Sequence, residues 1–220
     1  MIESQSNAQV KNVAKLLKSS KDRKKQRSYI IEGPKMVLEA VREGVVSKVY
    51  ISETMNNMLN GTQWDAEYNN NRLAHMSSKE ACGMINGSDH EVVKDNVFAA
   101  MCDTVVPQGM AAVASMPVMD IDDIMSASAG KTARRYIVLE NLRDPGNLGT
   151  IFRTAEAAGF DGVLMNRGTV DVYNPKVVRS TMGAILRVSH AYCDSIGIII
   201  DKCRNAGISL MGAALDGTDM

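Results

Sequence analysis

The chain has 220 residues, a length that suits one large domain or two small ones. Hydrophobic residues make up 45% and charged residues 23%, a globular composition that excludes global disorder and collagen-like or mucin-like classes. The four cysteines show neither a CxxC pattern nor zinc-ligand spacing, so they indicate reduced thiols and no metal site. No apolar stretch approaches the ~20 residues that span a bilayer, and the N-terminus is polar, so we expect a cytoplasmic protein without a membrane partner.

The net charge of zero hides an uneven distribution of charge along the chain. Residues 1–52 carry a net +6, residues 53–133 carry −7, and residues 134–220 carry +1. A basic block at one end is typical of contact with a phosphate backbone. The block is densest where six cations accompany a single carboxylate: Lys18, Lys21, Arg23, Lys24, Lys25 and Arg27. This run indicates either a solvated loop or an electrostatic landing site for RNA or DNA.

The first hundred residues predict a small α/β unit. Apolar residues at helical spacing predict a first helix from about Ser6, with Val10, Val13, Ala14 and Leu17 on one face. A strand, a helix and a second strand are expected over residues 29–32, 33–44 and 46–51. Residues 53–75 are polar and Asn-rich and give weak signals, and a further α/β stretch ends near residue 104.

Residues 105–133 interrupt this pattern and predict a connector between two domains. Within them, residues 111–115 are apolar enough for a strand, and residues 116–131 combine a proline, three Asp residues and a Ser/Ala/Gly tract. We therefore expect one domain over residues 1–104 and a second over residues 134–220.

The second half predicts strands that alternate with helices. Strands are expected over residues 136–140, 162–165 and 208–213, and helices end at Gly159 and Gly207. Such alternation is typical of α/β proteins with a parallel sheet of Rossmann-like character.

The loop after the strand over residues 136–140 is the most informative part of the chain. Asp-Pro-Gly predicts a tight turn, and Asn147 is expected to cap a helix whose free N–H groups attract a phosphate or another anion. Arg153 lies off the apolar stripe, so it either faces a ligand or pairs with Glu156 three residues later. The loop lacks the Gly-Lys-Ser/Thr of a P-loop and the third glycine of a dinucleotide fingerprint.

As a whole, the string Asp-Pro-x-Asn-x-Gly-x-x-x-Arg-x-Ala over residues 144–155 resembles the first motif of the SpoU/TrmH family. These are RNA ribose 2′-O-methyltransferases of the knotted SPOUT superfamily. Residues 171–184, 106–109 and 27–34 resemble further parts of the family, so the resemblance covers nearly the whole chain.

The resemblance implies a fold in two parts. A small N-terminal α/β RNA-binding domain, similar to a ribosomal-protein family, would precede a Rossmann-like parallel-sheet methyltransferase domain with a trefoil knot. The family segments that supply the knot, most of the S-adenosylmethionine pocket and an active-site Glu would lie beyond Met220. We therefore expect either an incomplete copy of a longer protein or a fragment that does not bind the cofactor normally, and no cofactor-binding residue is assigned.

The implied activity is transfer of a methyl group from S-adenosylmethionine to a ribose 2′-hydroxyl of RNA, with ribosomal RNA as the expected substrate. The resemblance makes Arg153 and Asn147 the catalytic candidates. A guanidinium with a pKa above about 12 is a poor base, so we interpret Arg153 as a clamp on the adjacent phosphate. Asn147 would orient the loop, or hydrogen-bond the ribose or Arg153. Lys176 and Arg179 would contact RNA phosphates together with Lys21, Arg23, Lys24, Lys25 and Arg27.

The family also implies a homodimer through the C-terminal domain, with each active site completed across the interface. Two alternatives of other classes remain: a non-catalytic RNA-binding protein that has lost the cofactor site, and a nucleotide-binding α/β enzyme unrelated to RNA. The basic N-terminal block disfavours the second. His75, His90 and His190 lie in no metal or triad spacing and are interpreted as incidental.

Overall fold

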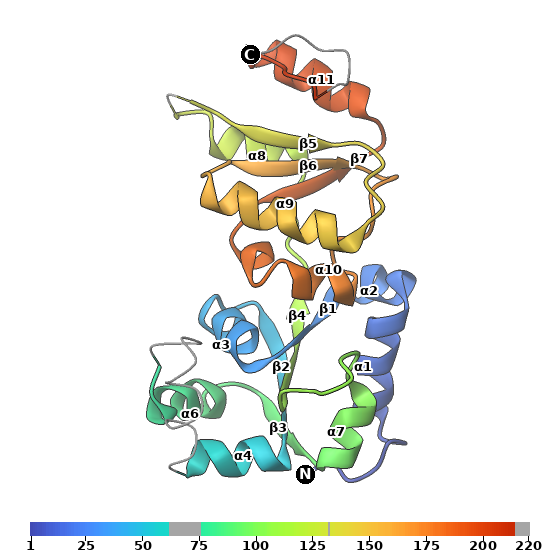
Figure 1. The fold of residues 1–220 in the computed structure, drawn as a ribbon, viewed down its shortest axis with the longest axis vertical. Helices are drawn as coiled ribbons and strands as arrows, with labels where there is room; N and C mark the ends of the chain where they lie inside the picture. The colour runs from blue at the N-terminus through green and yellow to red at the C-terminus, as the bar shows by residue number, and fades with distance from the viewer. Residues whose placement is uncertain (62–75, 132, 214–220) are drawn as a thin grey trace. The chain divides into compact units, whose positions relative to one another are not determined.

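The computed structural model describes residues 1–61, 76–131 and 133–213, drawn as a coloured ribbon in Figure 1. Trp64 and His75 lie outside the described residues. The contacts divide the chain into two compact units. Unit 1 contains Met1–Pro117 and Asp171–Leu186, and unit 2 contains Val118–Val170 and Arg187–Met220.

Unit 1 is built on a mixed four-stranded sheet. Its strands, in the order β1-β4-β2-β3, are β1 (Ser28–Glu32), β4 (Met110–Ser115), β2 (Val46–Ser52) and β3 (His90–Val93). β4 pairs antiparallel with both β1 and β2, and β2 pairs parallel with β3. The first five residues of β4 are buried, because its small apolar side chains are covered on both faces of the sheet. The strand predicted over residues 111–115 is therefore confirmed, and it lies in the middle of this sheet.

Helices surround this sheet. They are α1 (Ala8–Lys18), α2 (Ser20–Gln26), α3 (Pro34–Arg42), α4 (Glu53–Asn60), α6 (Ser78–Asn86), α7 (Asp95–Met101) and α10 (Pro175–Ser180), followed by a 3-10 turn, η1 (Ala184–Leu186). The Asn7 side chain accepts a hydrogen bond from the Gln9 N–H and so begins α1. Leu16 is fully buried in the core beside Val10 and Val13, whereas Leu17 is only partly buried.

Most of the basic run that could have been a loop forms the helix α2, between Lys18 at the end of α1 and Arg27, which follows α2. The Ser19 hydroxyl accepts from the Asp22 N–H at 3.1 Å and caps the first turn. Arg27 ends the helix in the left-handed conformation, with a φ of 51°. The run therefore has a fixed geometry, in which some of its cations point outward and one points inward.

Unit 2 is built on a parallel three-stranded sheet, β5-β6-β7, which confirms the predicted Rossmann-like character. The strands are β5 (Tyr136–Leu139), β6 (Gly162–Asn166) and β7 (His190–Cys193). The helices α8 (Ile121–Ala127) and α11 (Ile196–Asn205) share a core cluster with Leu164 and Ala191. The helix α9 (Pro145–Ala157) packs its Phe152 against His190 of β7. Neighbouring side chains of a strand point to opposite faces, so His190 and Ala191 face opposite sides of the sheet. Helices therefore cover both faces, as a parallel sheet requires.

The predicted buried strand over residues 208–213 is wrong. These residues form no strand, and Leu210 and Met211 are 43% and 80% exposed. Apolar composition alone does not make a strand, because each strand needs the backbone of a neighbour to pair with. Within the described part of the chain, no strand pairs with this segment.

Two features are absent from the described residues. No helix there has the length and apolar character needed to cross a membrane. No group of three or more His, Cys, Asp or Glu side chains in the same residues is arranged to hold a metal ion.

Candidate functional site

Two asparagines join the carboxyl ends of β5 and β6 in unit 2. The Asn141 backbone N–H donates to Asn166 Oδ1 at 2.9 Å, and Asn166 Nδ2 donates back to Asn141 Oδ1 at 3.0 Å. Thr169 Oγ1 donates to the same Asn166 oxygen at 3.1 Å. Asn141 adopts a φ of 53°, which asparagine tolerates better than most residues. In open α/β sheets this edge is where ligands bind.

Gly168 completes this edge, because a side chain at its position would displace the Asn141 side chain. A Cβ atom there would lie 1.8 Å from Asn141 Oδ1. Two residues later, the Val170 N–H donates to the Leu142 carbonyl at 2.8 Å, so the loops after β5 and β6 are bonded to each other. The sequence motifs did not point to Asn141, Asn166 or Gly168. The available signal was an asparagine at the end of each of two strands expected to be neighbours.

The first turn of α9 differs from the prediction in its cap. Asp144, not Asn147, is the N-cap: its Oδ1 accepts from the Asn147 N–H at 2.6 Å. Pro145 follows as the first helical residue, where its missing N–H costs nothing. Asn147 therefore lies inside the first turn with an exposed side chain. The Asp144 carboxylate already satisfies one of the N–H groups that were expected to attract an anion.

Arg153 is exposed on α9, and within the described residues no hydrogen bond or ion pair engages it. The alternative pair with Glu156 is wrong, because Glu156 accepts from Arg187 Nη2 at 3.0 Å. Six residues separate Arg153 from Asn147, a rotation of about 240° around the helix. The side chains of Asn147 and Arg153 therefore lie on different faces of α9, and the hydrogen bond that was considered between them is not formed. The exposed Arg153 side chain can reach a ligand.

Arg23 of unit 1 points inward, which corrects the expectation that it faces RNA. Its side chain is 3% exposed. Its Nη1 donates to the Leu16 and Leu17 carbonyls at 2.7 and 3.1 Å, and its Nη2 donates to Asp171 Oδ2 at 2.7 Å. A buried guanidinium needs such partners, and here they complete the C-terminal turn of α1.

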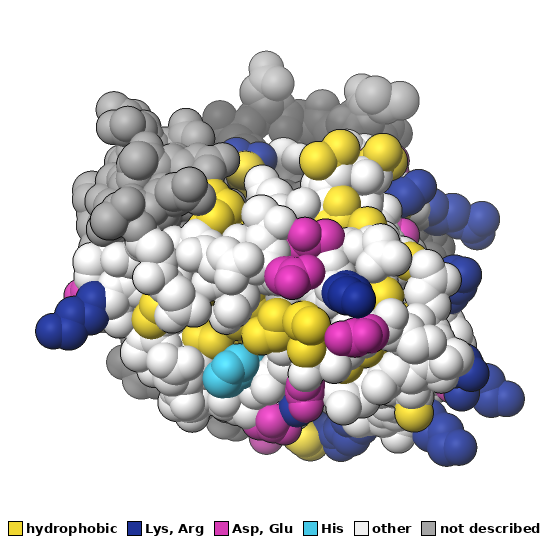
Figure 2. All heavy atoms as spheres, turned by 90° about the horizontal axis from the view of Figure 1, so that it is seen from below, with side chains coloured by type: hydrophobic (Ala, Val, Ile, Leu, Met, Phe, Trp, Pro, Cys, Tyr) yellow, Lys and Arg dark blue, Asp and Glu magenta, His cyan; other side chains and the backbone are white. Residues whose placement is uncertain are grey.

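The other predicted RNA contacts are more accessible. Five of these side chains are exposed: Lys21, Lys24, Lys25, Arg27 and Lys176. Arg179 on α10 is 31% exposed, and its Nη1 lies 2.8 Å from Asp103 Oδ2 in unit 1. Figure 2 shows one face of the molecule with acidic and hydrophobic side chains near its middle and Lys and Arg side chains mainly around its rim. The basic character of the chain is therefore local to particular elements.

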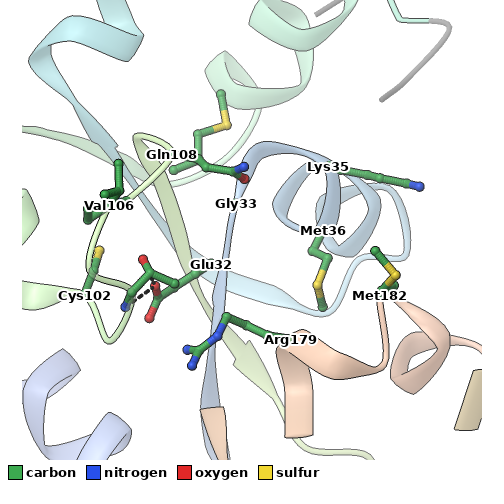
Figure 3. A pocket seen from close by; sticks show the side chains of 12 residues that line it. Glu32, Gly33, Lys35, Met36, Cys102, Val106, Gln108, Arg179 and Met182 are labelled. Atoms are coloured by element: carbon green, nitrogen blue, oxygen red, sulfur yellow. Dashed lines mark hydrogen bonds between the residues drawn. The ribbon is translucent and has the colours of Figure 1, made fainter. Parts of the chain in front are cut away.

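Unit 1 also holds a cavity of about 350 Å³ between the start of α3, the loop before β4 and α10 (Figure 3). Glu32 shapes this loop, because its carboxylate accepts from the Asp103 N–H and from Thr104 Oγ1, each at 2.8 Å. Met36, Met110 and Met182 are among the apolar lining residues, and Lys35 and Arg179 supply the cations. Burial, followed by the charge of Glu32, raises the pKa of the Cys102 thiol in the wall to about 12. Cys102 is therefore a neutral thiol, not a nucleophile.

His190 in β7 has a structural role in unit 2. The ring is buried against Phe152, with 5.3 Å between ring centroids, and its Nδ1 lies 2.9 Å from the Val188 carbonyl oxygen. Burial lowers its pKa below the ordinary value, and the carbonyl contact offsets this only in part. The histidine is therefore neutral when folded at neutral pH.

This burial predicts a pH dependence of stability. The unfolded chain binds a proton as the pH falls below about 6.5, whereas the folded chain does not until the pH is lower. The stability contributed by neutral His190 is thus fully present above that pH and lost as the pH falls through the folded pKa. Urea unfolding at pH 8 and pH 5 should show a larger loss for the natural protein than for His190→Asn. Equal losses would contradict this role.

The comparisons with known proteins follow the same division of the chain. Residues 134–220 match the family model described as the SpoU rRNA Methylase family, and residues 7–112 match the MRM3-like substrate binding domain. A solved AdoMet-bound rRNA methyltransferase from Sinorhizobium meliloti has a TM-score of 0.70 at 23% identity, over 93% of this chain and 68% of that one. A TrmH-family protein from Porphyromonas gingivalis has a TM-score of 0.70 at 26% identity, over 96% and 72%. The fold is therefore that of a two-part α/β protein of the SPOUT methyltransferase type.

Relatives of assigned activity define the family more closely. The chain is 30% identical over 215 residues to the 23S rRNA (guanosine(2553)-2′-O)-methyltransferase RlmP of Bacillus subtilis, covering 97% of this chain and 73% of that protein. It is 30% identical over 182 residues to human mitochondrial rRNA methyltransferase 3, covering 80% of this chain but 38% of that protein. The chain belongs to the SpoU family of RNA methyltransferases.

Proposed function

We propose that the complete protein transfers a methyl group from S-adenosylmethionine to a ribose 2′-hydroxyl of ribosomal RNA in the cytoplasm. The observation that carries the proposal is Arg153, exposed and unpaired among the described residues, on the helix that follows the Asn141–Asn166 edge of the sheet. The names of the relatives support it, since the Bacillus protein is named as a guanosine 2′-O-methyltransferase. The Sinorhizobium structure, described as AdoMet-bound, supports the cofactor.

The proposed reaction depends mainly on how the protein positions the ribose relative to the methyl group. S-adenosylmethionine supplies an electrophilic methyl group on a sulfonium when it is bound. The exposed Asp144 carboxylate at the start of α9 suits such a cation, because it supplies a negative charge. The ribose 2′-oxygen must lie in line with the methyl carbon and the sulfur, and holding it there supplies much of the rate enhancement. With the cofactor bound, its methyl group would pass to the ribose 2′-oxygen, its sulfonium would leave as a neutral thioether, and the hydroxyl proton would pass to water.

Arg153 acts in this proposal as a clamp on the phosphate next to the ribose. A guanidinium has a pKa above about 12, so it cannot accept the hydroxyl proton at neutral pH. It can hold two phosphate oxygens with parallel hydrogen bonds, which fixes the ribose in place. Its positive charge also favours the ionised form of the nearby hydroxyl. Asn147, on another face of α9, orients the loop or contacts the ribose.

We assign RNA binding to the solvent-accessible cations of unit 1 and leave out the buried Arg23. The set comprises Lys21, Lys24, Lys25, Arg27, Lys176 and Arg179. Homodimerisation through residues 134–220 is part of the same proposal. Exposed apolar side chains in this part of the chain, Ile198, Leu210 and Met211, support it.

Charge reversal on the basic helix α2 is expected to weaken RNA binding. Changing Lys24, Lys25 and Arg27 together to Glu should make the log–log slope of affinity against salt shallower by about 2 to 3, because each lost phosphate contact removes roughly 0.7 to 0.9. Fluorescence anisotropy with labelled ribosomal RNA fragments between about 50 and 200 mM salt measures this slope.

The matched control for this experiment reverses three exposed cations on other elements, Arg42, Lys79 and Arg204. This control has the same change in net charge, so a specific site predicts a clearly smaller change of slope for it. Equal slopes for the two variants would mean that Lys24, Lys25 and Arg27 contact solvent and no RNA phosphate.

The direct test of the proposed function is methyl transfer from radiolabelled S-adenosylmethionine to ribosomal RNA, followed by identification of the methylated nucleoside. A product carrying the label on the ribose supports the proposal.

A further inference from the structure

One segment belongs to the methyltransferase part of the sequence but folds with the substrate-binding part. Residues 171–186 lie inside the SpoU family match over residues 134–220. Their contacts place them in unit 1, with the match to the substrate-binding domain over residues 7–112. The chain therefore leaves unit 2 after Val170 and returns to it at Arg187.

The segment is fixed within unit 1 at its first residue. Asp171 Oδ2 accepts from Arg23 Nη2 at 2.7 Å and from Arg23 Nε at 3.2 Å. The side chains of Arg23 and Asp171 are 3% and 21% exposed, so this ion pair is largely shielded from water and salt. Arg23 belongs to α2, the same helix that presents Lys21, Lys24 and Lys25 to solvent.

Asp171 also organises the residues that follow it. Its Oδ1 accepts from the Tyr173 N–H at 3.0 Å, and its carbonyl accepts from the Asn174 N–H at 2.9 Å. Asn174 then caps α10. The Tyr173 ring lies 4.8 Å from the ring of Tyr29 in β1, centroid to centroid. One carboxylate therefore both binds α2 and begins the turn that packs on β1.

The residues on either side of the segment are fixed within unit 2 to the candidate catalytic elements. The Val170 N–H donates to the Leu142 carbonyl at 2.8 Å, in the loop that leads into α9. Arg187 Nη2 donates to Glu156 Oε2 at 3.0 Å, on α9 itself. Glu156 lies three residues after Arg153, which is about one helical turn.

We propose that Arg23 and Asp171 are positioning residues for the methyl-transfer site. Consecutive Cα atoms are held about 3.8 Å apart, so the Arg23–Asp171 pair limits how far the neighbouring Val170 can move. Val170 in turn holds Leu142, and with it the loop before Asn147 and Arg153. The helix that presents RNA-binding cations is thereby linked to the elements that carry the catalytic candidates. The effect of this link on methyl transfer rests on the proposed function, whereas the link itself rests on the contacts alone.

The test replaces Asp171 by Asn in the complete protein. This change keeps the size of the side chain and an oxygen acceptor but removes the charge that holds Arg23. We expect kcat to fall about 10- to 100-fold, because small misplacements of a reacting geometry have effects of this size. The KM for RNA and the Kd for S-adenosylmethionine should stay within about twofold, because α2 keeps its exposed cations.

Amide hydrogen exchange provides a readout that needs no activity. The Val170 and Asn141 N–H groups, bonded to Leu142 and Asn166, should exchange at least about tenfold faster in Asp171→Asn. The Val163 N–H, bonded to the Ser189 carbonyl in the sheet of unit 2, should keep its rate. Arg23→Lys is the second variant. It keeps the positive charge but loses the planar set of N–H donors of the guanidinium, so the three amides should change as in Asp171→Asn.

Asp89→Asn is the matched control, because it removes an ion pair of similar length, Lys48–Asp89 at 2.6 Å, from the same unit. It should leave kcat and all three amides unchanged. Unchanged exchange at Val170 and Asn141 in both test variants overturns the inference, as does equal acceleration at Val163, which would mean general destabilisation. If the natural protein transfers no methyl group but the two test variants show the predicted faster exchange, the link between α2 and the loop before α9 is supported and the proposed function fails.

Discussion

Replacing Arg153 by alanine in the complete protein is expected to lower methyl transfer at least about 100-fold, comparable with losing one preorganised donor in other active sites. The effect should fall on kcat, because the clamp acts on the reacting ribose. S-adenosylmethionine affinity should change less than about twofold. Stability should also be nearly unchanged, because the side chain is exposed and no bond within the described residues depends on it.

Two further measurements separate a clamp from a base. Arg153→Lys keeps the charge but loses the planar fork, so it should recover little of the lost rate. The natural enzyme's pH–rate profile should contain no titration assignable to residue 153, since a guanidinium stays charged throughout the working range. Arg204→Ala, at an exposed arginine on α11 of the same unit, is the matched control and should keep full activity. If Arg153→Ala folds normally and keeps near-normal activity, the catalytic assignment is wrong.

The second large effect is expected from a single methyl group at Gly168. In Gly168→Ala the new Cβ would lie 1.8 Å from Asn141 Oδ1, so the asparagine side chain must move. That movement breaks the 3.0 Å bond to Asn166 Nδ2 and releases the loop before α9. We expect kcat to fall about 10- to 100-fold, with a loss of stability of about 1 kcal/mol from the disrupted, partly buried hydrogen bonds.

Gly197→Ala provides the control for this substitution in the same unit. Its Cβ would meet only Ser195 Oγ, at 3.7 Å, an ordinary contact. Because Gly197 lies in α11, alanine there should stabilise the helix by up to about 1 kcal/mol and leave activity unchanged. Full activity in Gly168→Ala, with the Asn141–Asn166 pair shown to be broken, would mean that this edge of the sheet does not position the catalytic loop.

Local signals correctly predicted the helices α1, α3, α9 and α11 and the strands β1, β2, β4, β5 and β6. The helix α3 begins at Pro34, directly after Gly33, and ends before Gly44, and α9 and α11 end before Gly159 and Gly207, each glycine having a positive φ. These positions are readable because a glycine that accepts the left-handed conformation ends a helix without strain. The parallel sheet of unit 2 followed from the alternation of strand and helix patterns.

Long-range pairs could not be predicted from the sequence. Arg23 looked like one more cation of a basic run, and only its partner 148 residues away explains why it is buried. The Asn141–Asn166 pair joins residues 25 apart that no motif connects. The cap of α9 was misassigned because Asp144 and Asn147 are both good capping residues, and the distance of 2.6 Å from Asp144 Oδ1 decides between them.

Ribose methylation of RNA by the complete protein can be measured directly. The most direct measurement incubates it with S-adenosylmethionine labelled in the methyl group and with ribosomal RNA that lacks modifications. Digestion to nucleosides then locates the label. We predict one 2′-O-methylated nucleoside, formed by the natural protein and by Arg204→Ala but not by Arg153→Ala. RNA binding without any methyl transfer would support the non-catalytic alternative, and label on a base would contradict the proposed chemistry.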